Sequence, residues 1–374
     1  MNMILLRKPL FDPWLLLSAA SLICIGLVMV ASASIPIAEG YNLSPLYFTK
    51  HQLVAFALGL IAFCIVSYIP IRFWQKISFP LLWCSIIFLT ILIIPGVSRE
   101  VNGSVRWLRI GPISLQISEF VKLAFIIYIA GYLVRRQKEV QLNISGFLKP
   151  LFLLGVIAVL LLLEPDFGAV VVITGTVLGM LFLGGVPLIR FAMLFVFVLG
   201  ALILVSFASP YRISRLTSFL DPWADQFNTG YQLTQSLIAF GRGAWFGTGL
   251  GGSVQKLLYL PEPHTDFLFA VLSEELGLIG GIIVLILFSI LVMRALSIGR
   301  KAAIAKQYFA GHLAYGIGLW LSVQAMINIG VNIGVLPTKG LTLPLMSYGG
   351  NSLIVGLVAL ALLFRIDFEQ RTKI

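Results

Sequence analysis

The stretch YLPEPHTDFLFAVLSEELG, residues 259–277, gathers acidic side chains in a chain that has only 15 Asp and Glu residues. Glu262 and Asp266 stand just before a long apolar run, and Glu274 and Glu275 lie inside it. A carboxylate that is ionised and within reach of a hydroxyl group can act as a general base. Acids at the mouth of an apolar helix are therefore candidates for proton abstraction.

The four acids of this stretch do not have the same explanation. We expect Thr265 to cap the helix and Asp266 to lie in its first turn, where a carboxylate also complements the helix dipole by about 0.3–1 kcal/mol. Glu274 and Glu275 lie about 12 and 14 Å further along the helix at 1.5 Å per residue, too far for that role. At least one of them is expected to pair with a buried donor, and the sequence does not say which.

A second pair of charges stands in SEFVKLAFIIYIAGYLV, where Glu119 and Lys122 are three residues apart and so share one helical face. Ionisable groups inside a membrane helix cost about 2.5–3.5 kcal/mol, so they usually face a cavity or each other. The pair predicts either a polar cavity or a salt bridge that locks two helices. Gln324, Asn328 and Asn332 form a polar stripe with the same two explanations, interhelical hydrogen bonding or cavity lining.

The glycines of GTGLGG, residues 247–252, resemble a phosphate-binding loop only weakly. No strand–loop–helix context and no GxxxxGK[ST] motif accompany them. A turn-rich loop is the simpler interpretation, although backbone amides there can approach a diphosphate. The three cysteines, all in apolar runs and without CxxC spacing, predict buried apolar side chains and no disulfide or metal site.

Composition identifies the elements that must position these residues. The chain is 59% hydrophobic and 11% charged, which excludes an ordinary soluble domain. Apolar runs near 20 residues recur throughout, so we expect an all-α polytopic membrane protein that forms one integral membrane domain over 1–374. The ten expected spans are 14–34, 50–70, 77–95, 119–136, 150–164, 168–187, 191–208, 266–293, 307–335 and 345–364.

The distribution of positive charge predicts the topology. More than half of the 26 basic residues fall in one set of connections, which includes both termini, and the positive-inside rule makes that face cytoplasmic. The net charge of +11 is thus a topology signal and not a sign of a nucleic-acid partner. The other face carries a loop at 96–118 and a large extracytoplasmic loop at 209–265, between the seventh and eighth helices.

Charged residues that composition does not explain gather at this outer face: Arg106, Arg109, Glu119, Lys122, Asp266 and Lys339. Such a mixed cluster suits a lipid with a diphosphate head group, because Lys and Arg would hold phosphates while a carboxylate abstracts a proton. The residues themselves do not specify the reaction.

Three stretches, in order, resemble the SEDS family (shape, elongation, division and sporulation) of polytopic peptidoglycan polymerases. They are NGSVRWLRIGPISLQISEFVKLA, YQLTQSLIAFGRGAWFGTGLGGSVQKLLYLPEPHTDFLFAVLSEELG and NIGVNIGVLPTKGLTLPLMSYGGNS. EPDFG at 164–168 resembles the PDxG element of the family. LPEPHTDF and the third stretch look like the division branch more than the elongation branch. Glu164, Ala169 and Asn351 depart from the common pattern.

The resemblance implies a glycosyltransferase that polymerises lipid II during division, with inversion at the reacting carbon, in the bacterial cytoplasmic (inner) membrane at the septum. It implies Asp266 as the catalytic residue and Trp107, Glu119 and Lys122 as cavity positions. We expect Arg106, Arg109, Glu262 and Lys339 to contact the substrate. No particular cofactor is specified, and a divalent cation (Mg²⁺ or Mn²⁺) is left open as an aid to the leaving group.

The expected partners are lipid II, undecaprenyl-diphosphate-linked glycan, a class B penicillin-binding protein and other division proteins. Two other functions compete with polymerisation. A lipid II flippase would place its site near the bilayer midplane, often with repeat symmetry, whereas here the charges gather at one face. A non-enzymatic division scaffold leaves the cluster of Glu119, Lys122 and Asp266 without a purpose.

Overall fold

A computed structural model describes residues 11–94, 98–101, 104–110, 113–207, 218–338 and 340–372. The helices are α1 Pro13–Gly40, α2 Tyr47–Tyr68, α3 Ile71–Ile93, α4 Ile117–Arg135, α5 Gln137–Leu142, α6 Ile144–Leu163, α7 Phe167–Leu183, α8 Leu188–Phe207, α10 Tyr231–Gly243, α11 Leu268–Ile304, α12 Tyr308–Asn332 and α13 Gly350–Thr372. Three short strands, β1 Ser98–Val101, β2 Ser104–Ile110 and β3 Ile113–Gln116, precede α4. The predicted all-α membrane architecture is confirmed.

An apolar helix occupies each of the ten predicted positions. Eight of those described are long and apolar enough to cross a membrane, while α7 and the Leu188–Ala201 part of α8 are apolar but shorter. The apolar interior of a bilayer requires that backbone N–H and C=O groups form hydrogen bonds within the chain, and long helices meet this requirement. The number of membrane crossings stays a prediction.

The bundle is built around α4, α12 and α13, which are the most buried of the apolar helices, whereas α2 and α3 lie at its periphery. α12 packs against α11, α4 and α7. Gly299 of α11 and Gly311 of α12 allow two backbones to approach closely, since a side chain on Gly299 would meet Tyr315 and the Gly311 carbonyl. The three cysteines are exposed on this apolar surface, not buried as predicted, because a surface that faces lipid accepts small apolar side chains equally well.

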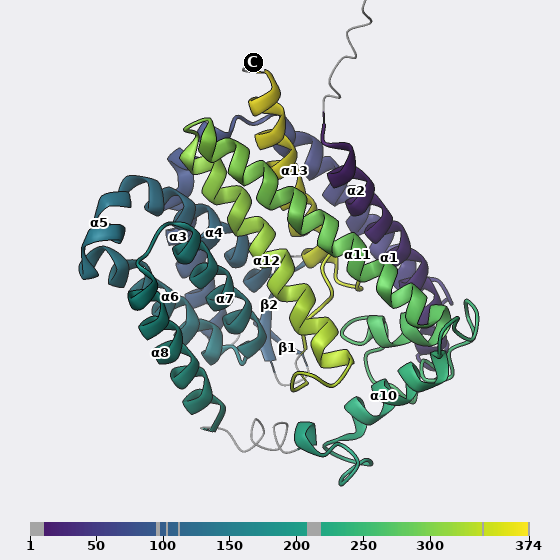
Figure 1. Cartoon of the computed structure of the whole chain (residues 1–374). Coiled ribbons are helices and arrows are strands. Elements are labelled where there is room, and N and C mark those ends of the chain that lie inside the picture. Colours follow the sequence, from purple (N-terminus) through teal and green to yellow (C-terminus); the bar gives the residue numbers. More distant parts are fainter. Residues whose placement is uncertain are drawn as a thin grey trace, which may run out of the picture.

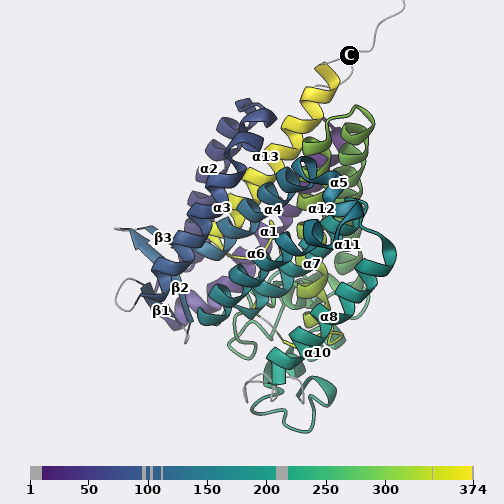
Figure 2. The same ribbon diagram turned by 90° about the vertical axis from the view of Figure 1, so that its left-hand side faces the viewer.

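Both described ends of the chain lie at one end of the bundle, and α10 and the sheet lie toward the other (Figures 1 and 2). Asp12 caps α1, with its Oδ1 accepting from the amides of Trp14 and Leu15 at 3.1 Å. The same carboxylate lies 3.6 Å from Arg371 near the end of α13. This arrangement agrees with the prediction that both termini share one face.

The region predicted as a loop at 96–118 contains the small sheet. Its strands are antiparallel in the order β1-β2-β3, and Trp107 of β2 is opposite Gln116 of β3. β3 runs directly into α4, and Asn351 of α13 donates to the Ser114 carbonyl at 2.9 Å. The sheet therefore fixes the entry to α4. Short strands with interleaved glycines give too weak a pattern to predict from the sequence.

The described part of the large loop predicted at 209–265 is folded against the bundle. It contains α10, which packs on α11 and α12, and Ser236 donates to the Asn332 carbonyl at 2.7 Å. The following helix begins at Leu268, with Phe267 at the N-cap. Asp266 was predicted in the first turn, and this was wrong because Thr265 does not cap the helix, which begins two residues after Asp266. Its Oγ1 donates instead to the Glu262 carbonyl and carboxylate, at 3.1 and 2.9 Å.

α11 is interrupted at Gly277, whose φ of 69° and ψ of −171° are not helical. A short helical segment, 268–276, is thereby separated from the long membrane helix that follows. The loop after α10 fills the break, as the amides of Leu278 and Ile279 donate to the carbonyls of Ala244 and Trp245 at 2.9 and 3.3 Å. A left-handed residue at such a close backbone approach has to be glycine.

Gly277→Ala is expected to destabilise the protein strongly, by about 2 kcal/mol or more, because it adds strain at positive φ and a steric clash. Its Cβ would lie 2.4 Å from the Gly247 nitrogen. Gly155→Ala in α6 is the matched control, since its Cβ meets nothing within 4 Å and its backbone is helical. Thermal unfolding should show a much lower unfolding temperature for Gly277→Ala and an unchanged one for Gly155→Ala.

The predicted topology is testable by cysteine labelling. A single cysteine at a position within 137–148 should react only from the cytoplasm, and one near residue 225 only from outside. Both regions contain exposed positions, including Asn143 and Ala224. Labelling of both from the same side would contradict the ten-span arrangement.

Candidate functional site

Glu119 and Lys122 form the predicted ion pair inside the bundle. Lys122 Nζ lies 2.8 Å from Glu119 Oε1, and the side chains are 1% and 7% exposed, respectively. Glu119 stands in the first turn of α4, where a carboxylate is also favoured by the helix dipole. The predicted pairing is confirmed. Its role in substrate binding stays a prediction.

The pair extends to α12 through polar side chains. Lys122 Nζ and Trp320 Nε1 both donate to Gln324 Oε1 at 2.8 Å, and Gln324 Nε2 donates to the Thr342 carbonyl at 3.0 Å. The Lys122 ammonium also lies 5.3 Å from the centre of the Trp320 ring. This cation is thus held by a carboxylate, an amide and an aromatic face, contributed by two helices.

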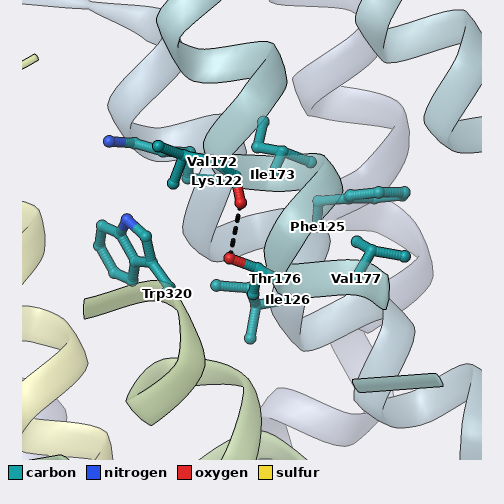
Figure 3. Close-up of a pocket in the computed structure, with 8 residues that line it drawn as sticks. All are labelled: Lys122, Phe125, Ile126, Val172, Ile173, Thr176, Val177 and Trp320. Carbon is teal, nitrogen blue, oxygen red and sulfur yellow. Dashed lines mark hydrogen bonds between the residues drawn. The ribbon is translucent and has the colours of Figure 1, made fainter. Parts of the chain in front are cut away.

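Beneath Lys122, a small pocket is lined mainly by apolar side chains of α4 and α7 (Figure 3). Its polar lining residue on α7, Thr176, donates to the carbonyl of Val172 at 2.7 Å. In the close-up, the Lys122 side chain extends over the Trp320 indole rather than down among the aliphatic groups. The charged group is therefore directed to the polar part of the bundle.

Asp266 is partly exposed and lies two residues before the start of α11. Its carbonyl accepts from Asn328 Nδ2 at 2.8 Å and from Asn332 Nδ2 at 3.0 Å. Asn332 Oδ1 accepts from the Ala270 amide at 3.1 Å. Two asparagines of α12 therefore fix the backbone of Asp266 and the start of α11.

The polar stripe on α12 links the two charged groups. Gln324 binds Lys122, whereas Asn328 and Asn332 bind the Asp266 carbonyl. Of the two explanations for the stripe, the contacts of the described residues favour hydrogen bonding between segments. The spacing of these residues predicted the stripe, but no sequence pattern indicated their hydrogen-bond partners.

The segment after α12 also approaches Asp266. A Cβ on Gly340 would lie 3.1 Å from Asp266 Oδ2, so the chain passes directly beside the carboxylate. Gly168 of the EPDFG element packs on Leu341, where a side chain would collide at 2.8 Å. Lys339, predicted to contact the substrate, lies outside the described residues. Glu262 is exposed and has a φ of 53° in the turn that leads to Asp266.

The remaining predicted substrate residues lie on β2. Trp107 is partly exposed. Arg106 and Arg109 lie on the same strand, but their side chains are outside the described part of the structure. The backbone thus places these three residues on a strand whose sheet leads into α4, the helix that carries Glu119 and Lys122.

His264 connects the turn at Asp266 to two other segments. Its buried ring lies 4.8 Å from the Phe48 ring and 5.1 Å from the Tyr348 ring, and its carbonyl accepts from the Tyr348 amide at 2.9 Å. Burial lowers the pKa of His264, and the nearby Glu262 carboxylate partly opposes this effect. The ring is therefore expected to be neutral at pH 7.

Because the folded-state pKa of His264 is lowered, the unfolded state binds more protons as the pH falls below the ordinary histidine value of about 6.5. The stability that a neutral ring contributes is present above that pH and is lost as the pH falls toward the folded-state pKa. His264→Phe keeps the aromatic packing and should flatten this part of the stability profile. The measurement is the unfolding temperature of both proteins between pH 5 and pH 8.

Glu274 and Glu275, whose partners were left open, are both fully buried and both paired. Glu274 lies 3.1 Å from Arg242 Nε, and Glu275 lies 2.7 Å from Lys256 Nζ. The GTGLGG loop packs on the same two residues, since the amides of Thr248 and Gly249 donate to the carbonyls of Glu274 and Glu275. These two amides therefore have internal partners, which agrees with a turn-rich structural loop.

Within the described ranges, no group of three or more His, Cys, Asp or Glu side chains is arranged to hold a metal ion. The site consists instead of a carboxylate beside a glycine segment, a buried cation, and an amide stripe that joins them. The site lies in a polytopic helical membrane protein. Helix α12 joins its described parts, because Gln324 contacts Lys122 while Asn328 and Asn332 contact the Asp266 carbonyl.

Residues 13–372 match the FtsW/RodA/SpoVE family of cell cycle proteins. This chain belongs to that family.

Two relatives match along nearly their whole length. The chain is 56% identical over 362 residues to the probable peptidoglycan glycosyltransferase FtsW of Legionella pneumophila, covering 97% of this chain and 92% of that protein. It is 53% identical over 359 residues to the protein of the same name from Coxiella burnetii, covering 96% of each.

Solved structures show the same fold. A chain from a peptidoglycan synthase complex that coordinates polymerization and crosslinking matches with a TM-score of 0.79 and 28% identity, over 97% of this chain and 99% of that one. The rod shape determining protein RodA of Thermus thermophilus matches with a TM-score of 0.71 and 26% identity, over 96% of this chain and 97% of that one.

Proposed function

We propose that this chain is a peptidoglycan glycosyltransferase that polymerises lipid II into glycan strands during cell division. The observation that carries this function is the partly exposed side chain of Asp266, whose backbone carbonyl is held by Asn328 and Asn332 of α12. Close similarity to proteins named peptidoglycan glycosyltransferase FtsW supports the same activity.

In this proposal, Asp266 is the general base. Its carboxylate takes the proton from the 4-hydroxyl group of the acceptor sugar, and that oxygen attacks the anomeric carbon of the growing chain. The new glycosidic bond forms as the bond to the diphosphate oxygen breaks, which inverts the carbon and releases undecaprenyl diphosphate. The Asn328 and Asn332 contacts to the Asp266 backbone would hold the base in place during this step.

The leaving diphosphate needs positive charge more than it needs a proton. Lys122 is a described cation on the same scaffold as Asp266, and Arg106, Arg109 and Lys339 are the further candidates by sequence. A divalent cation bound partly by the diphosphate would supply the same stabilisation.

The division branch resemblance supports a location in the bacterial cytoplasmic (inner) membrane at the septum. It also supports assembly with a class B penicillin-binding protein, which would crosslink the glycan made here, and with other division proteins. The structural similarity to a chain from a peptidoglycan synthase complex is consistent with such a partner. The active face would be extracytoplasmic.

The test is polymerisation of lipid II by the purified protein in lipid nanodiscs, with and without the partner transpeptidase. Glycan strands resolved by length are the expected product, and Asp266→Ala should give none. A wild-type protein that moves labelled lipid II between leaflets of vesicles but makes no polymer, even with its partner, would favour the flippase function instead.

A further inference from the structure

The short helical segment 268–276 begins two residues after Asp266, and buried charges fasten its other end. The break at Gly277 separates it from the rest of α11, so its position is not set by the long helix alone. α12 holds the end near Asp266 through Asn328 and Asn332. Glu274 and Glu275 lie at the opposite end, one turn before the break.

The two acids contact different elements. Glu274 accepts from Ser253 Oγ at 2.5 Å and from the amides of Val254 and Gln255 at 3.0 and 3.2 Å, and its cation, Arg242, is 44% exposed. Glu274 therefore keeps three hydrogen bonds within the loop if Arg242 is lost.

Glu275 depends on fewer, more buried partners. Lys256 Nζ, 7% exposed as a side chain, lies 2.7 Å from Glu275 Oε1, and Ser32 Oγ of α1 donates to both Glu275 oxygens at 2.7 and 2.9 Å. Lys256 Nζ also donates to Ser32 Oγ at 2.8 Å. Glu275, Lys256 and Ser32 thus form a closed triad that joins α11, the loop after α10, and α1.

We propose that Glu275 and Lys256 are positioning residues for Asp266, acting through the segment 268–276 as a rigid connection. The inference rests on the proposed function, in which Asp266 is the catalytic base. The segment is about 12 Å long at 1.5 Å per residue, so a tilt of about 5° moves its far end by roughly 1 Å. A misplacement of about 1 Å can slow catalysis about 100-fold.

Backbone packing restricts movement of this end of the segment. A Cβ on Gly243 would lie 1.9 Å from the Ser273 carbonyl oxygen, and one on Gly247 would lie 2.1 Å from that of Glu275. Such interlocked backbones leave few alternative arrangements once the triad is formed. Removing either Glu275 or Lys256 leaves the charge of the other one uncompensated. That buried charged group then has to reach water, and the segment 268–276 moves with it.

The experiment compares Glu275→Gln, Lys256→Met and the double variant in the full-length protein. We expect lipid II polymerisation to show a kcat lowered at least about tenfold with KM nearly unchanged, because the base is misplaced while substrate contacts remain. Amide hydrogen exchange should rise across 266–272, beyond the site of substitution. The double variant leaves no unpaired charge and should recover unfolding temperature without recovering kcat or exchange protection.

Asp12→Asn provides the matched control. Asp12 is also fully buried and also joins α1 to α11, through Arg294, but at the other end of the bundle. The Asp12→Asn substitution should lower the unfolding temperature. It should leave kcat per folded molecule and amide hydrogen exchange at 266–272 unchanged.

Wild-type kcat and wild-type exchange protection in the folded double variant would overturn the positioning role. Equal effects from Asp12→Asn would overturn it as well, since they would indicate general loosening. If the wild-type protein makes no glycan, the proposed function fails, and the exchange measurement alone still decides whether the triad fixes the residues around Asp266.

Discussion

Asp266→Asn is expected to give a folded protein that makes almost no glycan. Asparagine keeps the size of the side chain but cannot accept a proton, and general acid–base catalysis contributes about 10²–10⁴-fold to a rate. The contacts from Asn328 and Asn332 go to the backbone carbonyl of residue 266, so the substitution leaves them in place. Lipid II consumption, unfolding temperature and partner binding are the three measurements.

The competing explanation for Asp266 is a favourable interaction with the dipole of α11. It predicts a loss of stability of about 0.3–1 kcal/mol with polymerisation largely intact. Glu262→Gln is the matched control, since Glu262 is an exposed acid of the same turn. It should reduce the rate far less than Asp266→Asn. Near wild-type polymerisation by Asp266→Asn would leave the catalytic assignment untenable.

The helix positions were predictable because an apolar solvent leaves a chain few choices. Each long apolar run has to form its backbone hydrogen bonds within itself, and the structure has a helix at all ten predicted positions. The start of α11 was not predictable in detail, because Thr265 had two polar groups within reach. Its hydroxyl binds Glu262 rather than the helix end, and the helix begins at Leu268.

The candidate site shows the same division between local and long-range information. The Glu119–Lys122 pair follows from a spacing of three residues, which geometry converts directly into contact. Gln324, the second partner of Lys122, is 202 residues away, and Lys256 reaches Ser32 over 224 residues. Such contacts depend on how helices pack, which helical periodicity alone does not determine. The side chains of Arg106 and Arg109 and the whole of Lys339 lie outside the described structure, so their predicted substrate contacts stay predictions.

The break at Gly277 is another feature that a hydropathy pattern hides. The run from 266 onward reads as one continuous apolar helix, and glycine in such a run usually only weakens it. Here the loop after α10 enters the break and supplies backbone partners on both sides. The four acids of the opening stretch thus divide into a turn residue, a candidate base and two buried anchors.

Lys122→Met is expected to have the second large effect, on stability and activity together. It leaves the Glu119 carboxylate buried without its cation, and Glu119 Oε2 already has no hydrogen-bond partner among the residues that the structure describes. Removing one member of a buried ion pair costs about 3–5 kcal/mol. Gln324 Oε1 also loses one of its two donors, the other being Trp320 Nε1. A lower unfolding temperature is the first readout.

The double variant Glu119→Gln/Lys122→Met separates the two explanations of the pair. A purely structural salt bridge predicts that removing both charges restores much of the stability and, with it, polymerisation. A cation that stabilises the leaving diphosphate predicts restored stability but a rate that stays low, because the transition state still lacks the charge. Glu139→Gln is the control, since Glu139 pairs with Arg136 at a solvent-exposed site and should change neither quantity. Normal polymerisation and normal unfolding temperature in Lys122→Met would show that the pair serves neither purpose.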